Sequence, residues 1–176
     1  MSPENGPLER QNLWAPWRIQ HIQGLSRKSD CFLCEDLAAP EKDAENHVLW
    51  RTEHALVVFN KFPYNNGHLL VAPVRHISDL NQTTDAELLA LMRLVRDCQR
   101  VLTATIGPHG FNVGMNLGRC AGAGLPEHLH IHVVPRWNGD TNAMHVCSDT
   151  NVISQGIDEL YHQLVAVSAA ENLPQR

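Results

Sequence analysis

Three histidines alternate with apolar residues in segment 128–134, which reads His-Leu-His-Ile-His-Val-Val. Side chains alternate between the two faces of a β-strand, so His128, His130 and His132 are expected to share one face, about 7 Å apart. A row of imidazoles repels itself once protonated, so a chemical role is favoured over a purely structural one. Either all three rings bind a metal ion, or one ring attacks an electrophile while its neighbours bind the developing charge.

A loop rich in glycine and alanine, residues 118–124, precedes the histidines. Residues with small or absent side chains let an anion approach backbone N–H groups. The loop is not a P-loop, because no Gly-Lys-Ser/Thr follows it and the next element is a strand. It favours a phosphate ligand, with Gly122 and Gly124 as candidate substrate contacts, and therefore the second chemistry, attack on an electrophile.

A pair of cysteines in the sequence Cys31-Phe32-Leu33-Cys34 offers further ligands. Taken alone, this spacing fits a redox pair, a metal pair or two buried thiols. The chain has five cysteines, an odd number, and its polar first residues carry no export signal, so a disulfide framework is not expected. We expect a reducing, cytoplasmic location, in which a close cysteine pair favours metal binding or redox chemistry.

Composition limits the classes of protein to which the chain can belong. Its 176 residues are 43% hydrophobic and 19% charged, values typical of one globular domain. With 14 basic and 19 acidic residues the formal net charge is −5, so neither a nucleic-acid polymer nor an anionic membrane is an expected partner. No apolar run reaches the length of about 18 residues that predicts a transmembrane helix. We expect a flexible arm at residues 1–12, a single domain at 13–170 and a flexible tail at 171–176.

The elements that would position these residues are short strands and two helices. Apolar segments predict strands at 47–50, 55–59, 68–73, 111–117 and 129–134. A helix over 84–105 begins with a capping box of Thr84 and Glu87 and ends before Gly107-Pro108. Its residues at helical spacing predict a core-facing stripe of Leu88, Leu91, Met92, Val95 and Leu102. A shorter helix is expected over 157–166, and short turns between strands predict a largely antiparallel sheet in an α+β fold.

The histidine row resembles the signature of the histidine-triad (HIT) superfamily of nucleotide hydrolases and transferases. Supporting matches are Asn60, the run Gly-His-Leu-Leu-Val-Ala-Pro-Val-Arg-His at 67–76, and the segment from Asn112 to Asn116. Segments 13–18 and 134–140, with Cys31-x-x-Cys34, are similar to the branch that includes diadenosine tetraphosphate phosphorylases (ATP adenylyltransferases). The resemblance covers about residues 13–142. It implies a HIT-like fold of about five strands with the long helix packed on the sheet, and usually a homodimer, to which Trp14 and Trp17 or the long helix could contribute apolar contacts.

The resemblance also implies a mechanism. His130 would attack the α-phosphorus of a nucleotide and form a covalent nucleotidyl-histidine, with its other ring nitrogen held by the backbone carbonyl of His128. His132 and His68 would donate hydrogen bonds to the phosphate oxygens. Further substrate contacts implied are Asn116 to the phosphates and Asn60 to the ribose. For Trp137, a nucleotide contact, a subunit contact and simple packing in a turn stay open.

In zinc-containing relatives, a cysteine pair of this kind is completed by two histidines, which correspond here to His76 and His128. The resemblance therefore implies a structural Zn²⁺ bound by Cys31, Cys34, His76 and His128. No organic cofactor is implied. His128 would then serve as a metal ligand, and His130 and His132 would remain for phosphate.

The implied substrate is an adenine nucleotide or a dinucleoside polyphosphate, cleaved as a diadenosine tetraphosphate phosphorylase cleaves it. Two alternatives stay open: a hydrolase of nucleoside phosphoramidates or adenylated small molecules, and a nucleotide-binding regulator with little catalysis. One departure bears on the reaction. Several relatives have serine, threonine or glutamine shortly before the triad, where this chain has Ala123-Gly124-Leu125-Pro126. The absence of such a side-chain donor weakens the case for transfer to phosphate and points to hydrolysis or to an altered substrate range.

Overall fold

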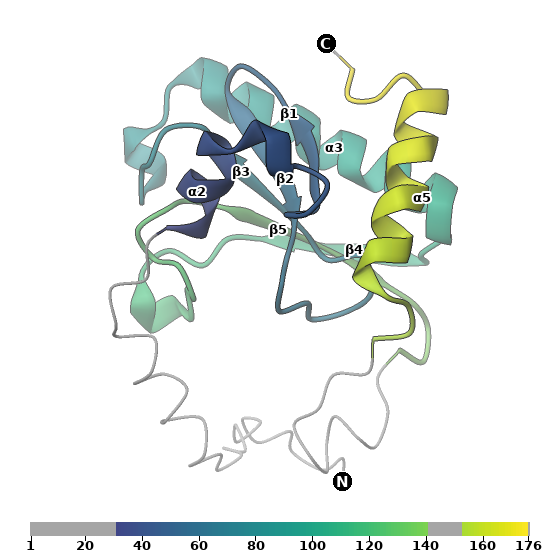
Figure 1. Ribbon diagram of the computed structural model, residues 1–176. Coiled ribbons are helices and arrows are strands. Elements are labelled where there is room, and N and C mark those ends of the chain that lie inside the picture. The colour runs from purple at the N-terminus through teal and green to yellow at the C-terminus, as the bar shows by residue number, and fades with distance from the viewer. Residues whose placement is uncertain (1–30, 141–152, 176) are drawn as a thin grey trace, which may run out of the picture.

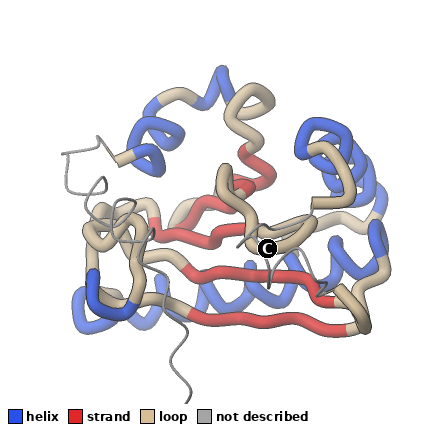
Figure 2. The backbone as a smooth tube through the Cα atoms, turned by 90° about the horizontal axis from the view of Figure 1, so that it is seen from below, coloured by secondary structure: helices blue, strands red, loops and turns tan. Residues whose placement is uncertain are grey.

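A single antiparallel sheet of five strands forms the centre of the computed structural model, which describes residues 31–140 and 153–175 (Figures 1 and 2). The strands lie in the order β1-β2-β3-β5-β4. Their bounds are Val48–Arg51 for β1, Ala55–Phe59 for β2, Leu69–Pro73 for β3, Gly110–Gly114 for β4 and Ile131–Arg136 for β5. The predicted antiparallel α+β fold is confirmed. The expected arm at residues 1–12 and the tryptophans Trp14 and Trp17 lie outside the described residues.

The longest helix, α3 (Asp85–Ile106), packs on one face of the sheet. As predicted, Thr84 and Glu87 form a capping box at its start, and Gly107, in the left-handed region at φ 54°, ends it. The predicted stripe is only partly buried, because the side chains of Leu88 and Met92 are 38% and 54% exposed. The buried face consists of Leu91, Leu94, Val95, Cys98, Val101 and Leu102.

Two hydrophobic clusters lie on opposite faces of the sheet. On one face, α3 and α5 (Ile157–Ala170) pack on alternate residues of β2, β3 and β5, including Val57, Val71 and Val133. On the other face, Leu33 of α2 (Phe32–Ala38) packs on Leu56 and Leu70. Figure 1 shows α2 in front of the sheet and α3 behind it. None of the described helices is long and apolar enough to cross a membrane.

Several predicted boundaries differ from the structure. β5 begins at Ile131 instead of residue 129, β4 ends at Gly114 instead of residue 117, and α5 continues to Ala170. The helix α2, which carries Cys34, was not predicted at all, and neither were the short 3-10 helices η2 (Leu80–Gln82) and η3 (Arg119–Ala121). A third 3-10 helix, η1 (Pro40–Lys42), lies in the charged segment 38–46, for which a loop with a short helical turn is expected. The two cysteines therefore stand at the start of a helix, with Cys31 at its N-cap position.

Candidate functional site

The triad histidines do not form a simple row of three rings. His130 and His132 are neighbours, with ring centroids 5.0 Å apart, and His68 lies 5.1 Å from His132. His128 turns instead toward His76, at 5.0 Å. His132 pairs across the sheet with Leu70, which belongs to the cluster on the α2 face, so the histidine site lies on the face opposite α3. His128, which lies before β5 begins, contacts Cys31 of the cluster on the α2 face, so it keeps the expected face while its ring turns away from the other two.

One hydrogen bond defines the tautomer of His130. Its Nδ1 lies 2.8 Å from the carbonyl oxygen of His128. A carbonyl oxygen only accepts, so Nδ1 carries the proton and Nε2 carries the lone pair. The side chain is buried, and this burial lowers the pKa of His130, which keeps the ring neutral at pH 7. His130 therefore presents a neutral nitrogen nucleophile.

A chain of hydrogen bonds defines the tautomers of His68 and His132 in the same way. The backbone N–H of Tyr64 donates to His68 Nδ1 at 3.1 Å, so the proton of His68 is on Nε2. That proton faces His132 Nδ1 at 2.9 Å. The proton of His132 is then on Nε2, which is buried and has no partner among the described residues. The arrangement holds a buried N–H donor beside His130, ready for an incoming acceptor.

Burial keeps this pair of histidines neutral. Burial, together with the neighbouring imidazoles, lowers the pKa of His68 to about 3 and the pKa of His132 to about 4. Uncharged rings tolerate the short contact between His68 and His132, which two imidazolium groups would oppose.

The two depressed pKa values predict that stability falls in acid. Between about pH 6.5 and pH 3 the unfolded chain binds more protons than the folded protein, so the free energy of unfolding decreases as the pH falls. We expect the urea midpoint of the wild type to drop more between pH 7 and pH 5 than the midpoint of His68→Asn. Equal drops in the two proteins would contradict this environment for His68.

Four potential metal ligands converge beside the histidine pair. They are Cys31, Cys34, His76 and His128, whose ligand atoms all lie within 4.8 Å of one another. Cys31 Sγ lies 3.2 Å from His128 Nδ1, and Cys34 Sγ lies 3.1 Å from His76 Nδ1. A tetrahedral zinc ion separates its nitrogen and sulfur ligands by about 3.3–3.8 Å, so this cluster fits such an ion after small adjustments.

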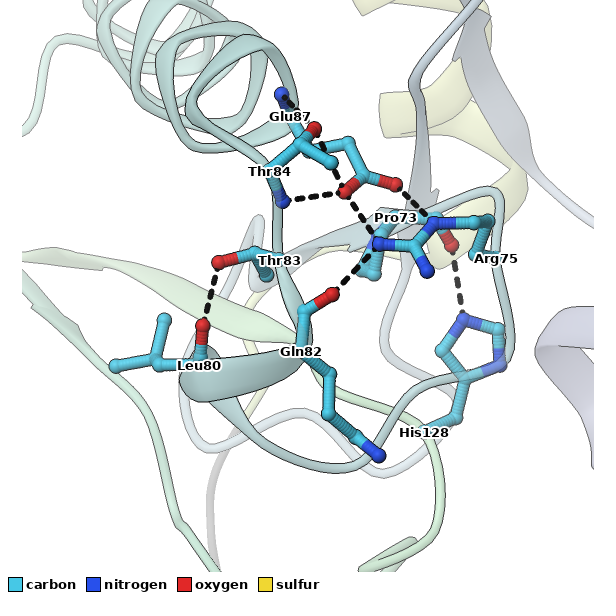
Figure 3. Close-up of polar contacts among 8 residues, drawn as sticks. All are labelled: Pro73, Arg75, Leu80, Gln82, Thr83, Thr84, Glu87 and His128. Carbon is cyan, nitrogen blue, oxygen red and sulfur yellow. Dashed lines mark hydrogen bonds and ion pairs between the residues drawn. The ribbon is translucent and has the colours of Figure 1, made fainter.

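His128 is oriented for metal binding by its second ring nitrogen. Nε2 lies 2.8 Å from the carbonyl oxygen of Pro73 and therefore donates to it (Figure 3). The lone pair of Nδ1 is then left facing the thiols of Cys31 and Cys34. Burial, together with the neighbouring Cys31, raises the pKa of the Cys34 thiol to about 11. A bound cation is therefore needed to hold Cys34 as a thiolate at pH 7.

The loop that carries His76 is attached to the start of α3. Arg75 donates two hydrogen bonds to the carboxylate of Glu87, both 2.6 Å long, and a third to the carbonyl oxygen of Gln82 (Figure 3). The same carboxylate accepts from the backbone N–H of Thr84 at 2.8 Å. One buried carboxylate thus joins the cap of α3 to the segment beside the metal cluster.

Glu87→Gln is expected to lower the free energy of unfolding by about 1 kcal/mol at pH 7. The Arg75 guanidinium and the Thr84 N–H hold the pKa of Glu87 near 2, so the charge stabilises the fold above about pH 4.5. The wild type loses this contribution as the pH falls toward 2. Urea unfolding of both proteins should therefore show a deficit that shrinks over this range, whereas Glu171→Gln, at an exposed position, should match the wild type throughout.

The residues predicted to contact the substrate differ in how close they lie to the histidines. Asn60 Nδ2 lies 3.3 Å from His68 Nδ1, and Asn116 Nδ2 lies 3.5 Å from the carbonyl oxygen of Gly122. Gly122, at φ 90°, ends η3 in the glycine loop, and Gly124 is exposed in the same loop. Trp137 follows the far end of β5, about 20 Å along the strand from His130. The roles of these residues toward substrate stay predictions.

The comparison with known families is decisive for classification. A model of the HIT domain matches residues 41–139. This chain belongs to the HIT family. A relative from Mycobacterium tuberculosis named AP-4-A phosphorylase is 41% identical over 151 residues, which are 82% of this chain and 77% of the relative. A HIT relative from Schizosaccharomyces pombe, named bis(5'-nucleosyl)-tetraphosphatase (asymmetrical), is 34% identical over 54% of this chain and 52% of its own.

Solved structures agree on the HIT fold. A Zn-bound histidine triad family protein from Mycobacterium smegmatis superposes with a TM-score of 0.63 at 24% identity, covering 81% of this chain and 97% of the other. A histidine triad nucleotide-binding protein from Sulfolobus tokodaii superposes with a TM-score of 0.62 at 24% identity, covering 81% and 93%. The predicted family and fold are confirmed.

Two residues near the HIT histidines were missed by sequence reasoning. The ring of Tyr64 stacks on His132, with ring centroids 5.5 Å apart and an interplanar angle of 26°, and it lies 4.7 Å from the ring of His68. Asn65 joins the same loop to Asp140. The short run Pro63-Tyr64-Asn65-Asn66 before Gly67 is typical of a turn, and an aromatic residue within it was the available signal.

Proposed function

We propose that this HIT protein is a nucleotidyl transferase or hydrolase that cleaves dinucleoside polyphosphates through a covalent intermediate on His130. The observation that carries the proposal is the hydrogen bond from His130 Nδ1 to the His128 carbonyl, beside the unpartnered N–H of His132. A neutral nucleophile and a preorganised donor at the developing charge are what phosphoryl-group transfer needs.

The reaction would proceed in two displacements at the α-phosphorus. The lone pair of His130 Nε2 forms a bond to phosphorus while the bond to the bridging oxygen breaks, and the remaining polyphosphate leaves with that oxygen. His132 Nε2–H donates to a phosphate oxygen as negative charge shifts during the step. His68 contacts His132 with its own N–H, so it would act through His132 and not directly on phosphate, which differs from the role that the resemblance implied. Phosphate or water then attacks phosphorus and releases His130.

Relatives support the substrate class. The M. tuberculosis relative carries the name AP-4-A phosphorylase, and the S. pombe relative carries the name of a bis(5'-nucleosyl)-tetraphosphatase. We therefore propose diadenosine tetraphosphate as the first substrate to test. Gly122 and Gly124 are exposed in the 118–124 loop, where small residues leave room for a phosphate chain. The backbone N–H groups of Ala121, Gly122 and Ala123 already donate to carbonyl oxygens within this loop.

The test is turnover of diadenosine tetraphosphate with and without inorganic phosphate, with products separated by chromatography. ADP and ATP formed only when phosphate is present identify a phosphorylase. AMP and ATP formed without phosphate identify a hydrolase, the outcome favoured by the missing hydroxyl or amide side chain at residues 123–126. Tight nucleotide binding with no turnover of this substrate or of a phosphoramidate panel would overturn the enzymatic proposal in favour of a regulator.

We propose Zn²⁺ as the ion bound by Cys31, Cys34, His76 and His128. Two thiolates and two imidazoles, the full ligand set found there among residues 31–140 and 153–175, make a closed tetrahedral site of the kind typical of structural zinc. When bound, the ion would supply a cross-link among α2, the segment after β3 and the segment before β5. Its four ligands come from this chain alone.

We also propose a homodimer. β4 is an edge strand of the described sheet, and Val113 on it is 43% exposed although it points to the α3 face. On α3, Leu89 and Met92 are 53% and 54% exposed. An open strand edge together with uncovered apolar side chains supports a second copy as partner. Light scattering is expected to give about twice 19.7 kDa, and Val113→Lys should shift the protein toward the monomer. A wild-type monomer would contradict the proposal.

A further inference from the structure

The loop between β2 and β3, residues 60–67, lies directly on the histidine pair. Tyr64 contacts this pair in two ways. Its backbone N–H donates to His68 Nδ1, and its ring stacks on His132. Asn60 Nδ2 also approaches His68 Nδ1, at 3.3 Å. Two donors facing one ring nitrogen require that nitrogen to be an acceptor. The position of the loop therefore decides which nitrogen of His68 carries the proton.

The tip of this loop is attached to the far end of β5 by one side chain. Asn65 Nδ2 donates to Asp140 Oδ2 at 2.8 Å and to the carbonyl oxygen of Pro135 at 3.1 Å. Asn65 Oδ1 accepts from the backbone N–H of Asn66 at 2.9 Å. Both polar atoms of the Asn65 amide are therefore in use, and they connect the residue next to Tyr64 to another part of the chain.

Asp140 is itself held firmly. Arg136 donates to both of its carboxylate oxygens, at 2.7 and 2.8 Å, and the backbone N–H of Trp137 donates at 3.1 Å. The side chain of Asp140 is only 11% exposed. Arg136 is thereby committed to Asp140 and to Asn112, whose Oδ1 lies 2.8 Å away. Asn65 is thus bound to a carboxylate that three other donor groups keep in place.

The base of the loop is anchored independently of Asn65. At Gly67 the backbone is in the left-handed region, at φ 74°, and a Cβ there would stand 3.0 Å from side-chain atoms of Leu102 and Ile106 of α3. Packing of Gly67 against α3 therefore fixes the point at which the chain leaves the loop and enters β3. The hydrogen bonds of Asn65 act further out, on the tip that carries Tyr64.

We propose that Asn65 and Asp140 are positioning residues that fix the tautomers of His68 and His132. They hold the Tyr64 N–H against His68 Nδ1, which places the His68 proton on Nε2 and the His132 proton on the Nε2 that faces the reaction. If the tip moved, His68 Nδ1 could carry the proton instead. His132 Nδ1 would then become the donor in the pair, and a bare lone pair at His132 Nε2 would face the phosphate oxygens. The catalytic part of this inference rests on the proposed function.

Asn65→Asp tests the pair because it replaces a donor by a carboxylate opposite Asp140. Asn65→Leu removes both hydrogen-bonding atoms of the side chain without adding a charge, so it separates the loss of the hydrogen bonds to Asp140 and Pro135 from charge repulsion. Asp140→Asn alone measures how far removing the negative charge beside Arg136 changes the histidine tautomers and kcat. Asn172→Asp is the matched control, since Asn172 is exposed beyond α5 and carries the same change of charge.

The first readout is ¹⁵N NMR of the histidine side chains in the ligand-free protein, which needs no turnover. In the wild type and in Asn172→Asp, we expect His68 and His132 each protonated on Nε2 only. In Asn65→Asp and in Asn65→Leu, both rings should show mixed tautomers. Wild-type tautomers in these two variants would overturn the inference.

The second readout is steady-state kinetics with diadenosine tetraphosphate. Asn65→Asp is expected to lower kcat about 10–100-fold with little change in KM, because a donor at the developing charge is lost and binding is kept. Asn65→Leu should show a similar loss of kcat. An unchanged kcat despite altered tautomers would remove the catalytic part of the inference. If the wild type turns over nothing while the Asn65 variants still show the expected tautomer changes, the proposed function is refuted. The positioning of His68 and His132 by Asn65 and Asp140 would still stand.

Discussion

Replacing His130 with asparagine is expected to lower kcat by at least about 1,000-fold while the protein stays folded. The asparagine amide can still donate to the His128 carbonyl, as His130 Nδ1 does at 2.8 Å, so the local backbone keeps its partner. What is lost is the nitrogen lone pair on the other side of the ring. Turnover of diadenosine tetraphosphate, together with a urea melt of each variant, separates the chemical effect from a folding defect.

The matched control is His162→Asn, because His162 is exposed on α5 and its ring contacts only its own helix and Tyr161 among the described residues. It should retain wild-type kcat. Substrate labelled in the α-phosphate should mark the wild type at His130 under acid-free quenching, and should not mark His130→Asn. A His130→Asn protein with full turnover, or a wild type labelled at another residue, would show that the nucleophile is assigned wrongly.

The sheet and its main helix were predictable because their signals are local. Apolar runs of strand length bounded by turn residues gave all five strands, and Ala55–Phe59 matched to the residue. Thr84 and Glu87 marked the start of α3, since a capping box satisfies N–H groups of the helix's own first turn. Patterns that depend on a few neighbouring residues can be interpreted from the sequence without knowledge of the contacts made by the rest of the chain.

What was missed depends on contacts between distant residues. Leu88 and Met92 have the spacing of a core stripe, yet they lie beyond the edge of the surface that α3 covers, because the periodicity gives a face but not its width. His128 leaves the row because its ring contacts Cys31, 97 positions earlier, and Pro73, 55 positions earlier. Strand alternation alone could not predict this, whereas the family resemblance supplied the ligand set.

Exchanging Cys34 for serine, which removes a thiolate and nearly preserves shape, is expected to abolish stoichiometric zinc and to lower the free energy of unfolding by at least about 3 kcal/mol. The ligand atoms come from α2, from the segment after β3 and from the segment before β5, so the ion would join three parts of the chain. Elemental analysis of protein purified without chelator, followed by urea unfolding, measures both effects. Cys120→Ser is the control, because Cys120 is exposed and lies outside the cluster.

Loss of the metal should also reduce turnover, because His128 contributes both to the metal cluster and to the orientation of His130. Its ring belongs to the cluster, and its backbone carbonyl holds His130 Nδ1. The backbone N–H of Leu129 donates to the carbonyl oxygen of Ile77 at 2.6 Å, next to His76, so the segments that carry the two histidine ligands are also joined directly. When the ring of His128 is released, the carbonyl can shift and His130 can exchange its proton between ring nitrogens. We therefore expect Cys34→Ser to lose kcat even at temperatures where it remains folded, and zinc content equal to wild type in that variant would refute the cluster as the binding site.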